Sequence, residues 1–154
     1  MSVFSTHERL ELRHLVNAPP DRVFEAWINP EYVEAWWGPD GFQTAVDKLD
    51  ARVNGQFTFK MTAPSGAFCT MRGTYIEIRR PHRLVFEVHQ HCITDLPDHV
   101  RAPSKPSMVE VTFRAKGGQT EICLIQTGLA DDYQMLAQGG WGQSLERLAR
   151  ISGK

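Results

Sequence analysis

The chain has 154 residues, of which 42% are hydrophobic and 23% charged, and its 17 basic residues nearly balance 18 acidic ones. This is the composition of one ordinary globular domain, and it excludes a disordered or fibrous chain. The net charge of -1 gives no electrostatic attraction for nucleic acid or an anionic membrane, so neither is expected as a partner.

The N-terminal residues lack the basic start and apolar core of a secretion signal, and no segment approaches the ~20 apolar residues that span a bilayer. We therefore expect a cytoplasmic protein. The three cysteines, Cys69, Cys92 and Cys123, are odd in number and form no Cys-x-x-Cys pair, which argues against a disulfide framework. They are interpreted as small core residues or as residues without a special role.

The first predicted element is a strand over residues 8–16, where Leu10 and Leu12 alternate with charged residues. Two prolines follow it. Asp21 then opens a short helix with one apolar stripe. A second short helix begins at Asn29-Pro30-Glu31, because Asn caps a helix and Pro fits its first position. It ends where Gly38-Pro39 prevents continuation.

The next region alternates between apolar and polar residues and predicts six strands separated by turn signals such as Asn54-Gly55 and Gly117-Gly118. Consecutive strands joined by tight turns indicate an antiparallel meander. Phe57 and Phe59 share one face of their strand, while Thr58 points the other way, so one face of the sheet is apolar. The predicted strands cover residues 42–51, 56–63, 67–79, 83–92, 108–115 and 119–127.

The last segment, residues 131–152, predicts a long helix whose apolar side chains recur every three or four residues, at Trp141, Leu145, Leu148 and Ile151. The apolar face of the sheet needs a cover, and this helix is the remaining candidate. We therefore predict an α+β fold in one domain over residues 1–154. A curved antiparallel sheet of about seven strands wraps around the C-terminal helix, with two short helices after the first strand.

Several short motifs occur in a characteristic order along nearly the whole chain. They are residues 22–27 (RVFEAW), 36–39 (WWGP), 73–76 (GTYI), 83–86 (RLVF), 126–128 (QTG), 139–141 (GGW) and 144–148 (SLERL). The order of elements resembles the START-like superfamily, also called helix-grip or SRPBCC domains. The motifs are similar to those of the family named after the activator of the heat-shock protein 90 ATPase, homologue 1-like.

This resemblance implies the helix-grip fold and leaves the function open, because one scaffold hosts many activities. The superfamily includes lipid carriers, plant hormone and allergen proteins, polyketide cyclases, aromatases and co-chaperone domains. It provides no shared catalytic motif that could be carried over to residues of this chain.

A sheet that curves around a helix encloses a cavity wherever the facing side chains do not fill the space. The inward-facing set predicted here is mostly apolar, with Tyr75 as a polar group, and suits a small apolar or aromatic ligand. A completely filled core is the alternative. The predicted lining residues are Trp37, Phe57, Phe59, Met61, Met71, Tyr75, Phe86, Val88, Phe113, Trp141, Leu145 and Leu148.

Two motifs have both a structural and a functional interpretation. Trp36 and Trp37 either seal the short helix against the sheet or also border the cavity. Gly139 and Gly140 cost about 2 kcal/mol together inside a helix, which indicates a bend or a close approach to the sheet or the cavity mouth. Alternatively, Gly139 ends a short first helix.

His89 and His91 could bind a metal together with Asp95, Asp98 or His99. The strand phase opposes this, because Val88 faces inward and both histidines are then expected to face solvent. We expect no metal site and no cofactor.

Familiar catalytic signals are also absent: the chain has no Gly-x-Ser-x-Gly, phosphate loop or His-Glu-x-x-His. Tyr75 and His14 are poor candidates for acid–base chemistry, so no catalytic residue is assigned. The segment 93–107 is longer than a hairpin needs and is interpreted either as a lid or subunit contact, or as disorder.

The leading hypothesis is noncatalytic binding of a small apolar or aromatic molecule between the sheet and the C-terminal helix. One alternative is an interaction domain like the chaperone activator, with a chaperone or another protein as its partner. The other is an enzyme of the cyclase or hydrolase kind. A homodimer stays open, since nothing in the sequence supports or opposes it.

Overall fold

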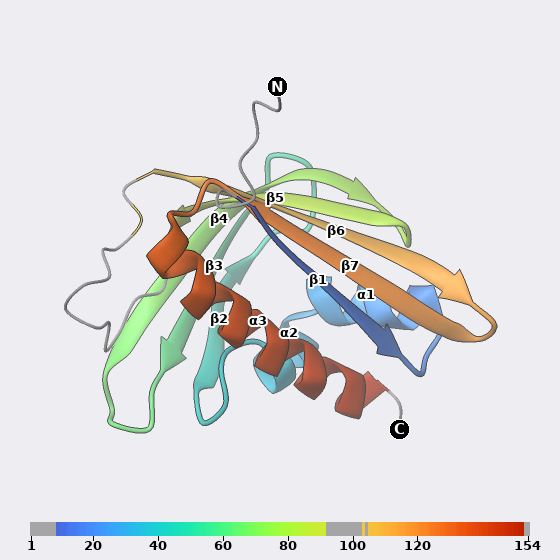
Figure 1. Cartoon of the computed structure of the whole chain (residues 1–154), viewed down its shortest axis with the longest axis horizontal. Coiled ribbons are helices and arrows are strands. Elements are labelled where there is room, and N and C mark those ends of the chain that lie inside the picture. The colour runs from blue at the N-terminus through green and yellow to red at the C-terminus, as the bar shows by residue number, and fades with distance from the viewer. Residues whose placement is uncertain (1–8, 92–102, 104, 153–154) are drawn as a thin grey trace.

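The computed structural model describes residues 9–91, 103 and 105–152 (Figure 1). They form seven strands and three helices. In chain order these are β1 (Arg9–Val16), α1 (Pro20–Ile28), α2 (Pro30–Trp36), β2 (Gln43–Leu49), β3 (Gln56–Thr62), β4 (Phe68–Arg79), β5 (Arg83–Gln90), β6 (Ser107–Lys116), β7 (Gln119–Thr127) and α3 (Asp131–Ser152).

All seven strands belong to one antiparallel sheet in the order β1-β7-β6-β5-β4-β3-β2. Strands β2 to β7 therefore form the predicted meander, and β1 extends it by pairing with β7. Figure 1 shows the sheet curving around α3, with α1 and α2 on the same side. The predicted α+β helix-grip architecture is confirmed.

Asn29 ends one helix and begins the next. Its backbone N–H donates to the carbonyl of Glu25 in the last turn of α1, and its side-chain oxygen accepts from the backbone N–H of Glu31 at 3.1 Å. Pro30 occupies the first position of α2, where a missing N–H costs nothing. The predicted helix boundary at this point is confirmed.

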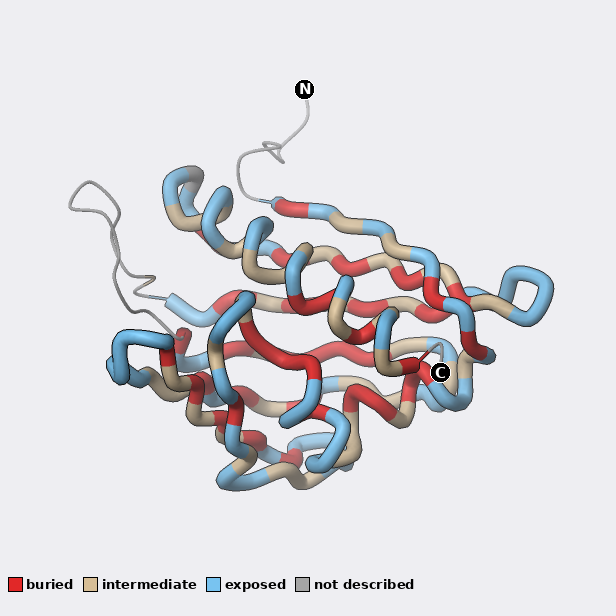
Figure 2. Tube along the Cα trace, turned by 90° about the horizontal axis from the view of Figure 1, so that it is seen from below, coloured by how far each residue is buried: buried red, intermediate tan, exposed pale blue. Residues whose placement is uncertain are grey.

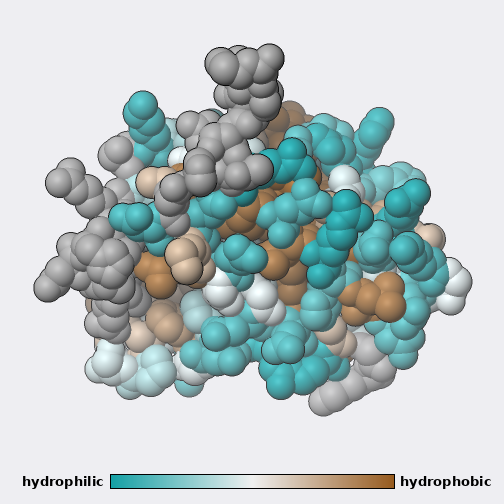
Figure 3. All heavy atoms as spheres, viewed as in Figure 1, coloured by the Kyte–Doolittle hydropathy of each residue, from teal (hydrophilic) through white to brown (hydrophobic). Residues whose placement is uncertain are grey.

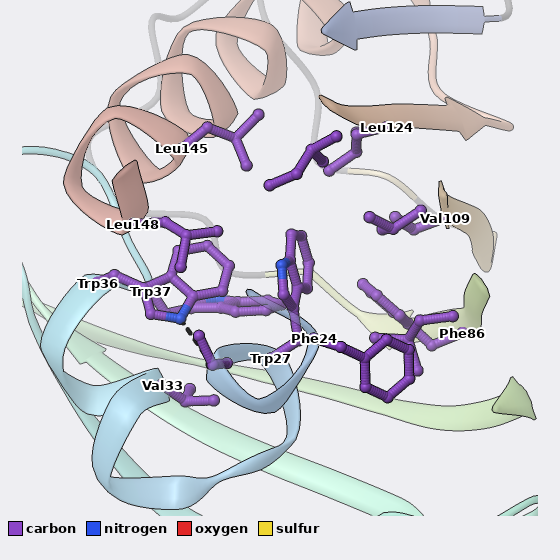
Figure 4. Close-up of a cluster of buried hydrophobic side chains, with 14 of the residues drawn as sticks. Phe24, Trp27, Val33, Trp36, Trp37, Phe86, Val109, Leu124, Leu145 and Leu148 are labelled. Carbon is purple, nitrogen blue, oxygen red and sulfur yellow. Dashed lines mark hydrogen bonds between the residues drawn. The ribbon is translucent and has the colours of Figure 1, made fainter. Parts of the chain in front are cut away.

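The core lies between the concave face of the sheet and the three helices (Figure 4). Strand residues alternate between buried and exposed, as the tube in Figure 2 shows, because successive side chains point to opposite faces. Trp27 and Trp36 pack edge to face with ring centroids 4.7 Å apart, and Trp36 Nε1 donates to the Ala26 carbonyl at 2.8 Å. Leu145 and Leu148 of α3 are buried in the same cluster, so the predicted cover of the sheet is confirmed.

Helix α3 is continuous over 22 residues. Gly139 therefore does not end a shorter first helix, and that interpretation is wrong. Among the residues that the structure describes, no helix is long and apolar enough to cross a membrane.

Strand β5 contains a bulge that changes the phase of its last residues. Val88 pairs with Gly73 and Gln90 pairs with Arg72, so two steps along β5 match one step along β4. An extra residue in one strand moves the following side chains to the opposite face. His91 is therefore buried instead of facing solvent, and the prediction that it points outward is wrong.

The neighbouring His89 is exposed, as predicted. Its Nε2 lies 2.8 Å from the hydroxyl of Thr74, and its Nδ1 lies 3.4 Å from a carboxylate oxygen of Glu87. These contacts keep it on the outer face of the sheet. The two histidines thus lie on opposite faces and do not form the metal-binding pair considered above.

Cys69 is disulfide-bonded, so the expectation that the cysteines are small core residues or residues without a special role is wrong for Cys69. Cys123 is the free cysteine of the described part of the chain, and it is partly buried on the outer face of β7.

Candidate ligand-binding cavity

A cavity of about 450 Å³ lies beside the N-terminal half of α3. Its walls come from that helix, from the loop after α2, from β3 and β4, from the residue after β5, and from β7. The described residues that line it are Trp37, Gly38, Pro39, Phe42, Met61, Met71, His91, Gln126, Tyr133, Met135, Leu136, Ala137, Gly139, Gly140, Trp141, Gln143 and Ser144.

Four of the residues predicted from the sequence line this cavity: Trp37, Met61, Met71 and Trp141. The remaining eight are buried in the core and do not border it. They are Phe57, Phe59, Tyr75, Phe86, Val88, Phe113, Leu145 and Leu148.

Close packing of aromatic rings explains why those core residues leave no space between them. The ring of Phe57 lies 4.8 Å from that of Phe59, 5.3 Å from that of Tyr75 and 5.4 Å from that of Phe86, measured between centroids. Trp37 closes this group, with its ring 4.9 Å from Phe59. These rings fill the space over the centre of the sheet, and the open space lies toward one end of α3.

Tyr75 was expected to be the polar group of the cavity, but it lies within the aromatic core. Burial, and secondarily the charge of Asp50, raises the pKa of its phenol. A buried, neutral phenol that does not border the cavity cannot orient a ligand there. The polar groups of the cavity are different residues.

Side chains of α3 hold the loop that forms one wall of the cavity. The hydroxyl of Ser144 accepts from the backbone N–H of Gly38 at 3.1 Å and lies 2.9 Å from the Gly38 carbonyl. Arg147 donates to the carbonyls of Gly38 and Pro39, at 3.0 and 3.3 Å. Gly38 has a φ of 111°, a conformation that favours glycine. Trp37 lines the cavity because this loop is tied to α3.

A chain of hydrogen-bonded side chains forms the polar wall of the cavity. Trp141 Nε1 donates to Gln126 Oε1 at 2.9 Å, and Gln126 Nε2 donates to Ser107 Oγ at 2.9 Å. Ser107 Oγ in turn lies 2.7 Å from His91 Nε2. Gln126, Trp141 and His91 line the cavity, whereas Ser107 lies behind it.

The cavity environment keeps its titratable side chains neutral. Burial lowers the pKa of His91 to about 4, because a charged imidazole would lose its hydration there. Burial also raises the pKa of Tyr133 to about 12. The two rings meet edge to face with centroids 6.0 Å apart. No Asp, Glu, Lys or Arg occurs among the described lining residues, so the walls carry no formal charge at neutral pH.

The cavity opens to solvent beside the first turns of α3. Met135 is 77% exposed and Leu136 is 43% exposed, although both contribute to the lining. Figure 3 shows hydrophobic surface near this end of the helix, among hydrophilic side chains. An exposed apolar rim next to a cavity is typical of a ligand entrance.

The helix glycines do not serve a close approach to the sheet. A Cβ built at Gly139 or at Gly142 would meet no described atom within 4 Å, and one at Gly140 would make an ordinary contact of 3.7 Å with Pro39. Gly139 and Gly140 border the cavity and Gly142 does not. The missing side chain therefore leaves open space at Gly139, which borders the cavity, whereas Gly140 lies against Pro39.

Within the described residues, no group of three or more His, Cys, Asp or Glu side chains could hold a metal ion. Asp95, Asp98 and His99 lie outside those residues, as does most of segment 93–107 with its proposed lid. His14 is half-buried on β1 and does not line the cavity.

Sequence reasoning missed several lining residues, including His91, Gln126 and Tyr133. One signal was present: Gln126 follows Ile122 and Leu124 in the same strand phase, which places a polar side chain on the inner face. His91 gave no such signal, because its orientation depends on the bulge in β5.

Comparison with solved structures supports the same architecture. A protein from Chromobacterium violaceum is 25% identical, with a TM-score of 0.82 over 96% of this chain and 98% of that chain. The AHSA1 protein from Silicibacter pomeroyi is 22% identical, with a TM-score of 0.76 over 93% of this chain and 96% of that chain. An AHSA1-like protein from Aeromonas hydrophila is 22% identical, with a TM-score of 0.70 over 92% and 90%.

No curated protein matches the chain. The family model described as "Activator of Hsp90 ATPase homolog 1-like protein" matches residues 17–153, which include the cavity walls contributed by α2, the sheet and α3. The resemblance inferred from the short motifs is thereby confirmed. The chain belongs to the Activator of Hsp90 ATPase homolog 1-like family, with a START-like fold.

Proposed function

We propose that this protein binds a small apolar or aromatic molecule in the cavity beside α3, without catalysing a reaction on it. The observation that carries this proposal is the composition of the walls: aromatic and methionine side chains lie beside a hydrogen-bonded polar chain, and the described lining residues carry no formal charge. A volume of about 450 Å³ lies within the range of small-molecule sites.

Two indole rings form the apolar walls around the ligand. Trp37 and Trp141 lie 5.1 Å apart between centroids and are tilted by 73°. Met61 and Met71 contribute flexible thioether side chains, which adapt to irregular shapes. Each buried ligand methylene contributes about 0.8 kcal/mol. Affinity is therefore expected to follow the apolar area of the ligand and its fit between the rings.

The Ser107–His91 pair resembles a nucleophile and its base, but its surroundings favour a structural role. Ser107 is only 2% exposed and does not line the cavity. Its oxygen already accepts a hydrogen bond from Gln126. Because burial lowers the pKa of His91 to about 4, the imidazole is a weak base at neutral pH. These features favour binding over acyl transfer.

The test uses 2-acetylnaphthalene as the probe and records amide and indole N–H resonances of the ¹⁵N-labelled protein during titration. Shifts are expected to centre on Trp37 and Trp141. Gly139→Leu places a side chain at the cavity wall and should weaken binding about tenfold or more. Gly142→Leu is the matched control, because it adds the same side chain to the same helix away from the cavity.

The proposal requires binding by the wild-type protein and selective loss in the Gly139 variant. Absence of saturable shifts up to the solubility of the probe would contradict it. Equal binding by Gly139→Leu and Gly142→Leu would also contradict it, because the bound probe would then lie outside this cavity.

A further inference from the structure

The hydrogen-bond chain of the cavity has a fixed direction. The indole of Trp141 can only donate, so the oxygen of the Gln126 amide faces it and the amide NH₂ faces Ser107. Ser107 thus receives a hydrogen bond from Gln126. Within the described residues, the remaining contact of its hydroxyl is with His91 Nε2 at 2.7 Å. The single proton of the hydroxyl has no other acceptor among the described residues, so pairing every polar group of the chain makes the Ser107 O–H the donor to that nitrogen.

This direction assigns the tautomer of His91. A neutral imidazole has one protonated nitrogen, and Nε2 is the acceptor, so the proton resides on Nδ1. His91 is 9% exposed and lines the cavity. Nδ1 makes no hydrogen bond within the described part of the chain. The largely buried His91 side chain thus carries an N–H donor that has no acceptor among the described residues.

The bulge in β5 is what brings this donor to the cavity. Val88 pairs with Gly73 and faces the core. The extra residue, His89, shifts the alternation of inward and outward side chains by one position, so His91 lies on the inner face beside Met71. Without that bulge the imidazole would face solvent. Bulges that redirect a side chain are common next to functional sites.

The described lining residues include no charged side chain that would compensate a charged ligand. Arg147 contacts the loop that forms one wall, but it is bonded to the carbonyls of Gly38 and Pro39 and is not a lining residue. A carboxylate or an ammonium entering the cavity would lose hydration without gaining a counter-charge, which is strongly unfavourable.

We infer that the cavity selects uncharged, largely apolar ligands that carry a hydrogen-bond-accepting oxygen, such as a ketone or an ether, and that this oxygen accepts the Nδ1–H of His91. The inference depends on the proposed binding function and adds a ligand class to it. It also assigns His91 as the residue that discriminates between ligands of equal shape.

The experiment compares two probes of the same shape, 2-acetylnaphthalene and 2-isopropenylnaphthalene, in which C=O is replaced by C=CH₂. Dissociation constants are measured by NMR titration for the wild-type protein and for His91→Phe. The preference for the ketone, taken as the ratio of the two constants, should be about fivefold larger in the wild-type protein. Comparing this ratio between the two proteins cancels the different hydration of the two probes.

His89→Phe is the matched control, because His89 is two residues away on the outer face. It should leave the ketone preference unchanged. A third probe, 2-naphthoate at pH 7.5, is expected to bind at least about 100-fold more weakly than the ketone, because its carboxylate meets no counter-charge.

A measurement on the wild-type protein keeps the test independent of the stability of His91→Phe. Long-range ¹H–¹⁵N correlation of the imidazole should show a neutral ring protonated at Nδ1, and addition of the ketone should shift the Nδ1 resonance. Protonation at Nε2 would overturn the inference. So would an unchanged ketone preference in His91→Phe, or naphthoate binding as tight as that of the ketone.

These outcomes separate the two proposals. If both neutral probes bind in the cavity but the ketone preference is the same in the wild-type protein and in His91→Phe, the ligand class is wrong and the binding function stands. If neither neutral probe binds, the binding function itself fails.

Discussion

Gly38 and Ser144, which are 106 positions apart in the sequence, meet through one hydrogen bond and a second short polar contact. The backbone N–H of Gly38 donates to the Ser144 hydroxyl at 3.1 Å, and the hydroxyl lies 2.9 Å from the carbonyl of the same glycine. Both contacts are buried. This contact joins the loop after α2 to the middle of α3, and it fixes the wall of the cavity to which Trp37 belongs.

Ser144→Ala should lower the free energy of unfolding by about 1–3 kcal/mol, because a buried N–H loses its acceptor. Urea denaturation monitored by far-ultraviolet circular dichroism measures the change. Gln143→Ala is the control: its side chain accepts from the backbone of Asp40 at 2.9 Å in an exposed position, and its loss should cost about 1 kcal/mol or less. A larger effect at Gln143 than at Ser144 would contradict the assigned role.

Arg147→Met should lower the free energy of unfolding by about 1–2 kcal/mol, because methionine keeps much of the apolar stem but cannot donate to the Gly38 and Pro39 carbonyls. Arg150→Met, in the exposed last turn of the same helix, should change stability by about 0.5 kcal/mol or less. Thermal and urea unfolding of both variants test the difference. Equal stability of the two variants would show that the Arg147 contacts contribute nothing.

His91 should make the protein less stable in acid. Its pKa is about 4 in the folded state, below the ordinary value of 6.5, so the unfolded chain binds this proton first. The contribution of neutral His91 to the free energy of unfolding is complete above pH 6.5, and it is lost as the pH falls toward 4. The slope for one proton cannot exceed about 1.4 kcal/mol per pH unit.

Urea unfolding at several pH values between 7.5 and 4.5 measures this slope. His91→Gln should show a shallower decline than the wild-type protein, and His89→Gln should keep the wild-type decline. An imidazole pKa near 6.5 for His91, measured by NMR titration, would be incompatible with its burial in the cavity wall.

Glycines in the strand and in the helix should respond to alanine in opposite directions. A Cβ at Gly73 would collide with the ring of Phe57 and the backbone carbonyl of Glu87, so Gly73→Ala should destabilise the protein by about 3 kcal/mol or prevent folding. Gly142→Ala meets open space in α3 and should stabilise it by about 0.5–1 kcal/mol. Midpoints of thermal unfolding give both signs. Stabilisation by Gly73→Ala would contradict the close packing of β3 on β4.

Local patterns were sufficient to predict the architecture of this protein. Alternation in β3, with Phe57 and Phe59 on one face, defines a sheet with one apolar side. The spacing of Leu145 and Leu148 defines the helix that covers it. Both signals arise from residues close together in the sequence, because the periods of strands and helices are local properties.

The location of the cavity could not be predicted in the same way. Periodicity indicates that Phe57, Phe86 and Trp141 all face inward, but not which of them fill the space completely. That outcome depends on how rings from different strands pack, and the aromatic cluster around Phe57 closes the centre of the sheet. The open space remains near Gly139, where the helix has no side chain.

By itself, the sequence determined the fold and the apolar residues that face its interior, since the period of each segment is a property of the local chain. Only the tertiary structure decided where the interior stays open and which polar group reaches it. His91 faces the cavity because β5 has one extra residue relative to β4 at the bulge. Such a shift in register exists only once the two strands have paired.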